Sequence, residues 1–360
     1  MKTLEPTTLN RTLARIYGAG VTARAAAYRM GFLRSRKLPV PVVSVGNLTV
    51  GGSGKTPLVE RLCRDLLEMG YRPAVLSRGY RGEAERSNLL VSDGRQISAG
   101  AETAGDEPYL LACLLPDVPI AVGRKRFRSA ALILERLPEP RRIFVLDDGF
   151  QHLALARDLD LVAIDANTSS ECRLLPAGRL REHPTALRRA DGVCLTRCHL
   201  RRARPEVLEN QIHTIDPRLP CFRFVTRYVG WVDERGSILP LDARARIRAV
   251  ALAGVAQPQQ FLDDLAQLGI RIISEFLLPD HHRFTSQELD RIISHAHRLG
   301  AEAIVTTEKD RVRLERFFPL PVPLLALRIR FEPASPDVWR RWLSDHLPSN
   351  PPRQGSLERE

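Results

Sequence analysis

A glycine-rich segment between a strand-like run and a helical stretch constrains the fold of this 360-residue chain more than any other feature. The apolar run Val40–Val45 leads into Gly46–Pro57, and an apolar pattern with helical spacing follows over Leu58–Met69. Glycines in such a turn allow successive backbone N–H groups to point inward around phosphate oxygens, next to the positive end of the following helix. The segment therefore predicts a phosphate-binding loop (P-loop) inside an α/β domain.

Two side chains at the end of this loop have predicted roles in holding a nucleotide. Lys55 would reach the β- and γ-phosphates of ATP, and the hydroxyl of Thr56 would ligate Mg²⁺. ATP and Mg²⁺ are therefore the expected cofactors. The other loop positions expected to surround the phosphates are Thr49, Val50, Gly51, Gly52, Ser53 and Gly54.

The loop also departs from the usual P-loop pattern. Thr49 stands where that pattern has a glycine, five places before Gly54. The core Gly51–Thr56 instead resembles the loops of partitioning-type ATPases, but Val50 stands at the position of their signature lysine. A membrane-associated ATPase of that type is therefore the alternative to a phosphotransferase.

A pair of adjacent carboxylates is the candidate magnesium site. The apolar run Ile143–Leu146 ends in Asp147 and Asp148, and neighbouring residues of an extended chain point in different directions. One carboxylate can therefore face the metal while the other orients a water or a partner, and either of the two fits the first role. Glu107 is a third candidate ligand.

The rest of the chain predicts two α/β lobes of the P-loop NTPase type. Short apolar runs that alternate with helical segments favour a mainly parallel sheet with helices on both faces. These runs are Ala74–Ser77, Ile120–Val122, Ile143–Leu146, Leu161–Ile164 and Gly192–Thr196. A strand–turn–strand pattern over residues 222–241 predicts a two-stranded linker. The expected parts are an N-terminal helix (1–37), a P-loop core domain (38–221), the linker (222–241), a smaller α/β lobe (242–347) and a disordered tail (348–360).

The basic character of the chain is concentrated at its N-terminus. The formal net charge is +12, and residues 1–37 contain eight basic residues and one acidic residue. The stretch Thr8–Leu33 predicts a helix with arginines opposite an apolar face of Leu9, Leu13, Ile16, Tyr17, Val21, Tyr28 and Phe32. This pattern is typical of a helix in a membrane interface, and a helix packed on the protein's own surface is the alternative. No stretch is long and apolar enough to predict a membrane-spanning helix.

The cysteines indicate a reducing compartment and no structural metal. Six cysteines are scattered through a long chain, whereas small disulfide-stapled domains have them closely spaced. Cys194, Cys198 and His199 resemble half of a zinc site, but no second pair of ligands follows at a usable spacing. We therefore expect a cytoplasmic protein without zinc.

Acidic and basic clusters outside the loop supply candidates for transferring a phosphoryl group. Asp106 lies in the acidic turn Gly105–Pro108, and His281 lies in Pro279–His282 of the second lobe. An Asp–His pair across the interlobe cleft would suit a general base, although each motif alone also fits a helix cap or a surface loop. Three arginine-containing segments are candidates for phosphate recognition or are solvated basic surface. They are Ser77–Gly82, Gly123–Arg128 and Pro176–Glu182.

Taken together, these motifs resemble the tetraacyldisaccharide 4'-kinases, a family that phosphorylates the lipid A precursor in Gram-negative bacteria. The resemblance runs from about Leu13 to Leu343. It rests on the Gly46–Pro57 loop, Ser77–Tyr80, Gly105–Pro108, Asp147–His152, Pro176–Arg179, Asp280-His281 and Thr307–Asp310.

The resemblance implies transfer of the γ-phosphate of ATP to the 4'-hydroxyl of a tetraacyldisaccharide 1-phosphate. It implies Asp106 as the base, His281 as its partner, and Arg124 as a cation near the transferred group, with Lys55 completing the catalytic set. The residues implied to line the cleft are Arg78, Tyr80, Glu107, Gln151, His152 and Arg179. The segment Thr307–Asp310 either approaches the nucleotide or closes a loop.

The resemblance also implies a place in the cell. We expect a peripheral protein on the cytoplasmic face of the inner membrane, acting as a monomer and binding no nucleic acid. A kinase for a soluble metabolite is a further alternative, but such an enzyme would have no use for an arginine-rich amphipathic helix.

Overall fold

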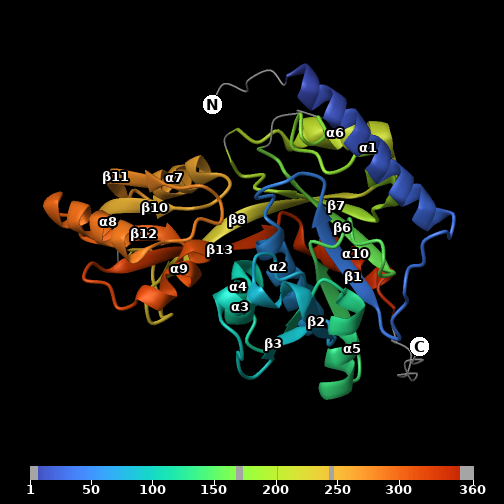
Figure 1. Cartoon of the computed structure of the whole chain (residues 1–360), viewed down its shortest axis with the longest axis horizontal. Helices are drawn as coiled ribbons and strands as arrows, with labels where there is room; N and C mark the ends of the chain where they lie inside the picture. The colour runs from blue at the N-terminus through green and yellow to red at the C-terminus, as the bar shows by residue number, and fades with distance from the viewer. Residues whose placement is uncertain (1–6, 168–172, 201, 243–246, 349–360) are drawn as a thin grey trace.

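The computed structural model describes residues 7–167, 173–200, 202–242 and 247–348. The expected disordered tail lies outside this range except for Pro348, and so do the first six residues of the expected N-terminal part. In the described residues the strands form one continuous 13-stranded sheet, which runs through two lobes lying side by side (Figure 1). The expected α/β fold class is confirmed.

The first lobe contains the P-loop and the long part of the sheet. Its elements are β1 (Val42–Asn47), α2 (Lys55–Glu68), β2 (Arg72–Ser77), η1 (Glu83–Arg86), β3 (Leu89–Asp93), α3 (Ala101–Ala104), α4 (Asp106–Leu114), β4 (Pro119–Val122), α5 (Arg126–Arg136), β5 (Arg142–Asp147), β6 (Leu159–Asp165), η2 (Pro184–Arg189), β7 (Gly192–Thr196) and α6 (Pro205–Ile215). The strand order is β7-β6-β1-β5-β2-β4-β3. Every pairing in this row is parallel except that of β3, a short edge strand that the sequence analysis missed.

Alternating side chains of these strands supply two cores. On one face, Val43, Val45 and Val145 pack against helices that include α2 and α4. On the other face, Phe144 and Leu146 of β5 pack against α5. Successive strand residues point to opposite faces, so apolar runs without polar interruption bury both sides. Helices therefore cover both faces, as the sequence predicted.

The second lobe repeats this arrangement on a smaller scale. Its elements are β10 (Arg248–Ala253), α7 (Pro258–Gln267), β11 (Arg271–Leu277), α8 (Ser286–Arg298), β12 (Ala303–Thr307), α9 (Glu308–Leu314) and η4 (Glu315–Phe317). The order β11-β10-β12-β13 is parallel throughout. One core lies beneath α7 and the other beneath α8.

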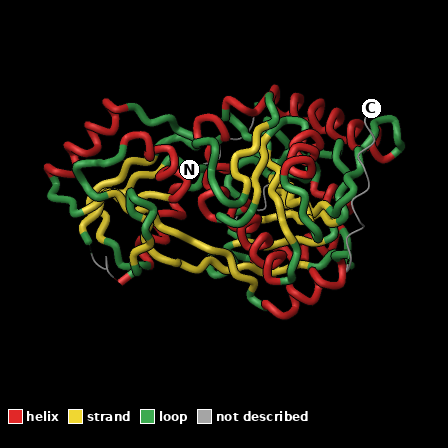
Figure 2. Tube along the Cα trace, turned by 90° about the horizontal axis from the view of Figure 1, so that it is seen from below, coloured by secondary structure: helices red, strands yellow, loops and turns green. Residues whose placement is uncertain are grey.

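Two long antiparallel strands join the lobes. β8 (Cys221–Val232) pairs with β13 (Leu324–Pro333) from Phe224 to Val232, and the small β9 (Ile238–Leu239) pairs with β8. Both long strands run between the lobes in Figure 1, and Figure 2 shows the same bridge from below. The strand–turn–strand pattern over residues 222–241 predicted β8 and β9, but no pattern predicted β13, which supplies half of the bridge.

The last helix returns to the first lobe. α10 (Pro336–His346) buries Trp339 and Leu343 in the core shared with α2. The indole N–H of Trp339 donates to Oδ2 of Asp65 in α2 at 2.8 Å. The expected boundary of the second lobe at residue 347 therefore differs from the structure, because β13 carries the chain back before α10 begins.

The N-terminal helix α1 (Thr8–Arg29) lies along the outer side of the first lobe (Figure 1). One side of it packs on the protein: the hydroxyl of Tyr17 donates to the carbonyl of Arg181 at 3.0 Å. A neighbouring strip of the helix surface exposes Leu9, Leu13 and Ile16, at 66%, 43% and 65% of their accessible surface. The helix therefore packs on its own protein, as the alternative interpretation has it, and because it also presents an apolar stripe, the membrane-interface role stays a prediction. None of the helices in the described ranges is long and apolar enough to cross a membrane.

Candidate active site

The segment predicted to be the P-loop connects β1 to α2, and its backbone geometry requires glycine. Gly51 and Gly54 have φ angles of +98° and +78°, a region that side-chain-bearing residues rarely adopt. A Cβ on Gly54 would lie 2.6 Å from the ring of Phe331 in β13. Lys55 begins α2 directly after this turn, so the loop backbone and the helix N-terminus face the same space.

The loop is fixed from behind by hydrogen bonds. The Asn47 amide donates to the Thr49 carbonyl at 2.6 Å and to the Ser53 hydroxyl at 2.8 Å. Arg179 donates through its guanidinium to the Val50 carbonyl at 2.9 Å, and the Val50 N–H donates to the Arg179 carbonyl at 2.8 Å. Arg179, expected in the cleft, therefore lies against the P-loop and supports it.

Asp147 presents a buried oxygen beside the loop. Its Oδ2 accepts from the Ser77 hydroxyl at 2.8 Å, whereas Oδ1 is buried without a hydrogen-bond partner among the described residues. Burial, together with the charges of Glu107 and Asp148, raises the pKa of Asp147 to about 7. An unpartnered buried carboxylate oxygen among other acids fits the donor set of a divalent cation.

Asp148 lies in a different environment, although it is the next residue. Arg181 Nη1 contacts both of its carboxylate oxygens, at 3.0 and 2.9 Å, and Lys55 Nζ lies 3.5 Å from Oδ1. Burial alone would raise the pKa of Asp148, but the cations of Lys55 and Arg181 outweigh it and lower the pKa to about 2. Arg181 belongs to the arginine-containing segment Pro176–Glu182, but no sequence feature distinguishes it from the other arginines there.

The basic cluster after β4 places two of its arginines, Arg124 and Arg126, in different environments. Arg124 is exposed, and its backbone N–H donates to the Glu85 carbonyl. Arg126 is buried, and its Nε has no partner in the described part of the chain. Burial lowers the pKa of Arg126 to about 10, while the charges of Asp147 and Asp148 oppose this shift. The inward-facing cation of this cluster is therefore Arg126.

Asp106 and His281 meet across the two lobes, as predicted. Asp106 is the first residue of α4, and its Oδ2 lies 3.1 Å from His281 Nδ1. The same oxygen accepts from Nε of Arg313 in α9 at 2.7 Å. Burial opposes ionisation, but the hydrogen bond from His281 and the charge of Arg313 lower the pKa of Asp106 below its usual range. Asp106 is therefore a carboxylate at neutral pH.

The two adjacent histidines of the second lobe have different partners. His281, with a φ angle of +60°, points to Asp106, whereas His282 lies 3.2 Å from Glu288 in the first turn of α8. Thr285 and Glu288 form a capping box at this helix start. His281 is thus the imidazole of the site, and His282 belongs to a helix cap.

The segment Thr307–Asp310 reaches the site from the start of α9. Lys309 Nζ lies 3.0 Å from Oε1 of Glu107 and 3.2 Å from Nε2 of His281. Asp310 is fully buried and accepts from Arg313 Nη1 at 2.7 Å. The sequence left this segment open between two roles. The signal available was its position directly after a buried strand, where loops of α/β sheets carry functional groups.

The remaining predicted cleft residues lie around this centre. Gln151 donates to the Asn47 carbonyl at 3.0 Å. Burial, together with the charge of Arg126, lowers the pKa of His152 to about 4. Tyr80 lies edge-on to the His281 ring, with 6.0 Å between ring centroids.

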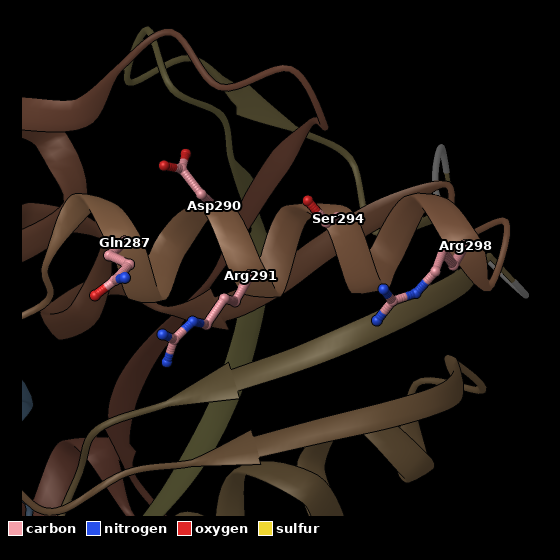
Figure 3. A pocket seen from close by; sticks show the side chains of 5 residues that line it. All are labelled: Gln287, Asp290, Arg291, Ser294 and Arg298. Atoms are coloured by element: carbon pink, nitrogen blue, oxygen red, sulfur yellow. The ribbon is translucent and has the colours of Figure 1, made fainter.

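Arg78, also expected in the cleft, is paired with Glu85 at 2.6 Å, and its guanidinium carbon lies 5.9 Å from the centroid of the Tyr80 ring. A separate surface pocket on α8 is lined by Gln287, Asp290, Arg291, Ser294 and Arg298 (Figure 3). Within the described ranges no three His, Cys, Asp or Glu side chains gather as a metal site, so Cys194, Cys198 and His199 form none. Magnesium is commonly held by one or two carboxylates plus phosphate oxygens, and it does not need such a group.

Comparison with known proteins gives a consistent result. Residues 7–348 match the family described as "Tetraacyldisaccharide-1-P 4'-kinase". The tetraacyldisaccharide 4'-kinase of Geobacter sulfurreducens is 40% identical over 90% of this chain and 88% of its own. That of an Anaeromyxobacter species is 42% identical over 88% and 85%. The crystal structure of LpxK from Aquifex aeolicus in complex with ATP superposes with a TM-score of 0.74 at 32% identity, covering 93% of this chain and 98% of that one.

Proposed function

The chain belongs to the tetraacyldisaccharide-1-phosphate 4'-kinase family, and from this premise we propose how its residues perform the reaction. The protein is an ATP-dependent kinase of lipid A biosynthesis. One contact supports the proposed roles of the individual residues most strongly. Asp106 from the first lobe meets His281 from the second lobe, next to the acidic residues of the first lobe.

The P-loop would hold the triphosphate. The backbone around Gly51 and Gly54 supplies N–H groups, and Lys55 supplies a cation for the β- and γ-phosphates. Arg126 is buried and has an unpartnered nitrogen, which supports a role in neutralising charge on the transferred group. We assign to Arg126 the role that the sequence resemblance implied for Arg124.

The acids after β5 would hold magnesium. Asp147 is proposed as the direct ligand because its Oδ1 has no protein partner in the described structure, whereas Arg181 already contacts both oxygens of Asp148. Thr56 and Glu107 complete the proposed donor set with phosphate oxygens. When bound, Mg²⁺ would neutralise charge on the phosphates and help to orient them.

Asp106 would accept the proton of the attacking hydroxyl. His281 and Arg313 both contact its Oδ2, so Oδ1 is the oxygen left for the acceptor among the described contacts. As the 4'-hydroxyl oxygen forms its bond to the γ-phosphorus, its proton passes to Asp106. The bond from that phosphorus to the bridging oxygen breaks, and Lys55 stabilises the charge on the departing ADP.

The lipid acceptor explains the position of α1. Arg24 of this helix donates to the Gln151 carbonyl, and Tyr17 donates to the Arg181 carbonyl, so the helix borders the site itself. We propose that its exposed stripe of Leu9, Leu13 and Ile16 lies in the cytoplasmic leaflet of the inner membrane, where a glycolipid reaches the site by lateral diffusion. Both lobes of one chain supply every residue named here, so a monomer suffices.

A transfer assay tests the proposal. Incubation with γ-labelled ATP, Mg²⁺ and a detergent-dispersed tetraacyldisaccharide 1-phosphate should place label on the 4'-position of the distal sugar, and chelation of the metal should stop transfer. Label appearing only as inorganic phosphate would indicate an ATPase and would contradict the proposed reaction. Equal transfer to a soluble, unacylated disaccharide would contradict the membrane-side acceptor.

Replacing the exposed stripe should release the protein from membranes. The triple variant Leu9→Ser, Leu13→Ser and Ile16→Ser removes apolar surface worth roughly 1.5–3 kcal/mol per fully buried side chain. We expect sedimentation with anionic lipid vesicles to fall at least about tenfold. The matched control is Val207→Ser with Val338→Ser, two exposed apolar residues outside α1, which should sediment like the unmodified protein. Unchanged vesicle binding by the triple variant would rule out the membrane role of α1.

A further inference from the structure

The backbone carbonyls of the phosphate loop are all occupied by donors from the protein. Each carbonyl oxygen of residues 49–54 accepts a hydrogen bond. The donors are the side chains of Asn47, Arg179, Thr196 and Arg197 and the N–H groups of Ser53 and Leu58. A carbonyl oxygen has a partial negative charge, so one that faced the triphosphate would repel it. These donors therefore keep the carbonyl dipoles of the loop turned toward the protein.

Arg197 differs from the other donors because it connects the loop to two further parts of the protein. It follows β7 with a φ angle of +59°, a region that side-chain-bearing residues rarely adopt. Its Nη1 donates to the Gly52 carbonyl at 2.9 Å, to Asp165 Oδ2 at 2.6 Å and to Gln257 Oε1 at 3.3 Å. Asp165 ends β6 in the first lobe, and Gln257 directly precedes α7 in the second.

The carboxylate of Asp165 fixes the direction of the Arg197 guanidinium. The two side chains are 2% and 14% exposed, so both are largely removed from water. The other oxygen of Asp165 accepts from the Asn167 N–H at 2.9 Å, which fixes the carboxylate in turn. A charge-assisted hydrogen bond of this kind is short and directional. Because the opposite charges are in contact, the pair orients the loop and adds little net charge to it.

The second lobe packs on the loop at the same point. A Cβ on Gly51 or Gly52 would lie 3.5 or 3.8 Å from the Cβ of Ala256. Ala256 directly precedes Gln257, so the apolar contact and the hydrogen bond to Arg197 come from one turn between β10 and α7. The position of this turn therefore affects the direction of the Arg197 guanidinium.

We propose that Arg197 is a positioning residue for ATP binding, which holds the Gly52 carbonyl away from the phosphates in an orientation that Gln257 ties to the second lobe. The inference rests on the proposed role of the P-loop in holding the triphosphate. Without Arg197 the Gly52 carbonyl is free to turn toward the phosphates, and its dipole would then oppose their binding. Arg197 contacts neither Lys55 nor Asp106 in the described structure, so its loss affects ATP affinity more than transfer.

Arg197→Met should weaken equilibrium binding of ATP to the full-length protein by about 10–100-fold, the range for loss of a hydrogen bond to a charged group. The KM for ATP should rise with it, whereas kcat at saturating ATP and the KM for the tetraacyldisaccharide 1-phosphate should change by less than about threefold, as for a group that acts in binding alone. A fall in kcat with unchanged ATP affinity would overturn the proposal.

A double variant separates orientation of the loop from stability and charge. Arg197→Met alone leaves the buried carboxylate of Asp165 without its cation, which destabilises the fold. Arg197→Met combined with Asp165→Asn has the net charge of the unmodified protein and should regain most of the lost Tm, while ATP binding stays weak. Recovery of ATP affinity together with Tm would show that Arg197 acts through stability alone and would refute the positioning role.

Gln257→Leu tests the connection to the second lobe. In the unmodified protein it should weaken ATP binding by about threefold, as expected for one long hydrogen bond. In the Arg197→Met background it should have no further effect, because the group through which Gln257 acts is gone. Equal effects in the two backgrounds would contradict the proposed link between Gln257 and Arg197.

Arg223→Met is the matched control. Arg223 pairs with Glu209 at 2.7 Å in the same lobe, and it donates to no carbonyl of the loop in the described structure. ATP affinity should be unchanged. Lys55→Met, measured in the same binding assay, tests the P-loop assignment separately. If Lys55→Met weakened ATP binding and Arg197→Met did not, the P-loop assignment would stand and the role of Arg197 would be withdrawn.

Discussion

Asp106→Asn should lower kcat by about 10³-fold and leave ATP affinity within about threefold of the unmodified protein, in the range expected for loss of a general base. The asparagine amide keeps the size of the carboxylate but cannot accept the hydroxyl proton. It would still lie near His281 and Arg313, so the site should remain assembled. Single-turnover transfer and equilibrium binding of ATP measure the two quantities separately.

The control for this substitution is Glu102→Gln. Glu102 is an exposed acid of α3, four positions before Asp106, and it pairs with Arg316 across the lobes. Its loss should leave kcat nearly unchanged. If Asp106→Asn lowered ATP affinity as much as turnover, Asp106 would be acting through the metal or nucleotide, and its role as the base would be withdrawn.

Lys55→Met should reduce kcat by about 10²–10³-fold and also weaken ATP binding. Removing one preorganised positive group from a transferring phosphoryl group typically has an effect of this size. In addition, Lys55 lies 3.5 Å from Asp148, so its loss leaves that carboxylate with fewer cations beside the phosphates. The missing cation and the less compensated carboxylate of Asp148 both weaken binding of the triphosphate. Lys55→Met should therefore lower both kcat and ATP affinity, whereas Asp106→Asn should lower kcat alone.

Arg95→Met provides the comparison for Lys55→Met. Arg95 is an exposed cation in the turn after the edge strand β3, which is separated from β1 and the P-loop by β5, β2 and β4. The Arg95→Met substitution changes the net charge by the same amount as Lys55→Met, but it lies outside the site. Full turnover by Lys55→Met would disprove the P-loop assignment, because no other lysine follows Gly54 at the start of α2.

The parts of the fold that the sequence predicted are those with strong local signals. Buried parallel strands such as β5 are continuous apolar runs, and the P-loop has its own glycine pattern. The long strand β13 was missed because its pairing with β8 is non-local, and because the partly buried arginines Arg328 and Arg330 interrupt its apolar pattern. The short edge strand β3 has only a weak apolar pattern.

The site residues that the sequence predicted are likewise those with a strong local signal. Asp106, His281 and the Asp147–Asp148 pair lie in distinctive motifs, and the structure brings the first two together. Arg313, Arg181 and Arg126 could not be selected among many arginines, because their selection depends on which of them is turned inward by tertiary packing. The family resemblance implied Arg124 as the cation near the transferred group. Arg124 is exposed, whereas Arg126, two residues later, is buried.

The paired crossing of β8 and β13 determines how the lobes can move. A domain attached by one peptide segment is free to swivel, whereas this lobe is inserted between two hydrogen-bonded strands and can only bend or twist with the ribbon they form. Phe331 of β13 touches the P-loop at Gly54, so one end of that ribbon rests on the nucleotide site. Torsion of the ribbon would therefore reach the phosphate loop through this contact, and it would also change the angle at which Asp106 and His281 meet.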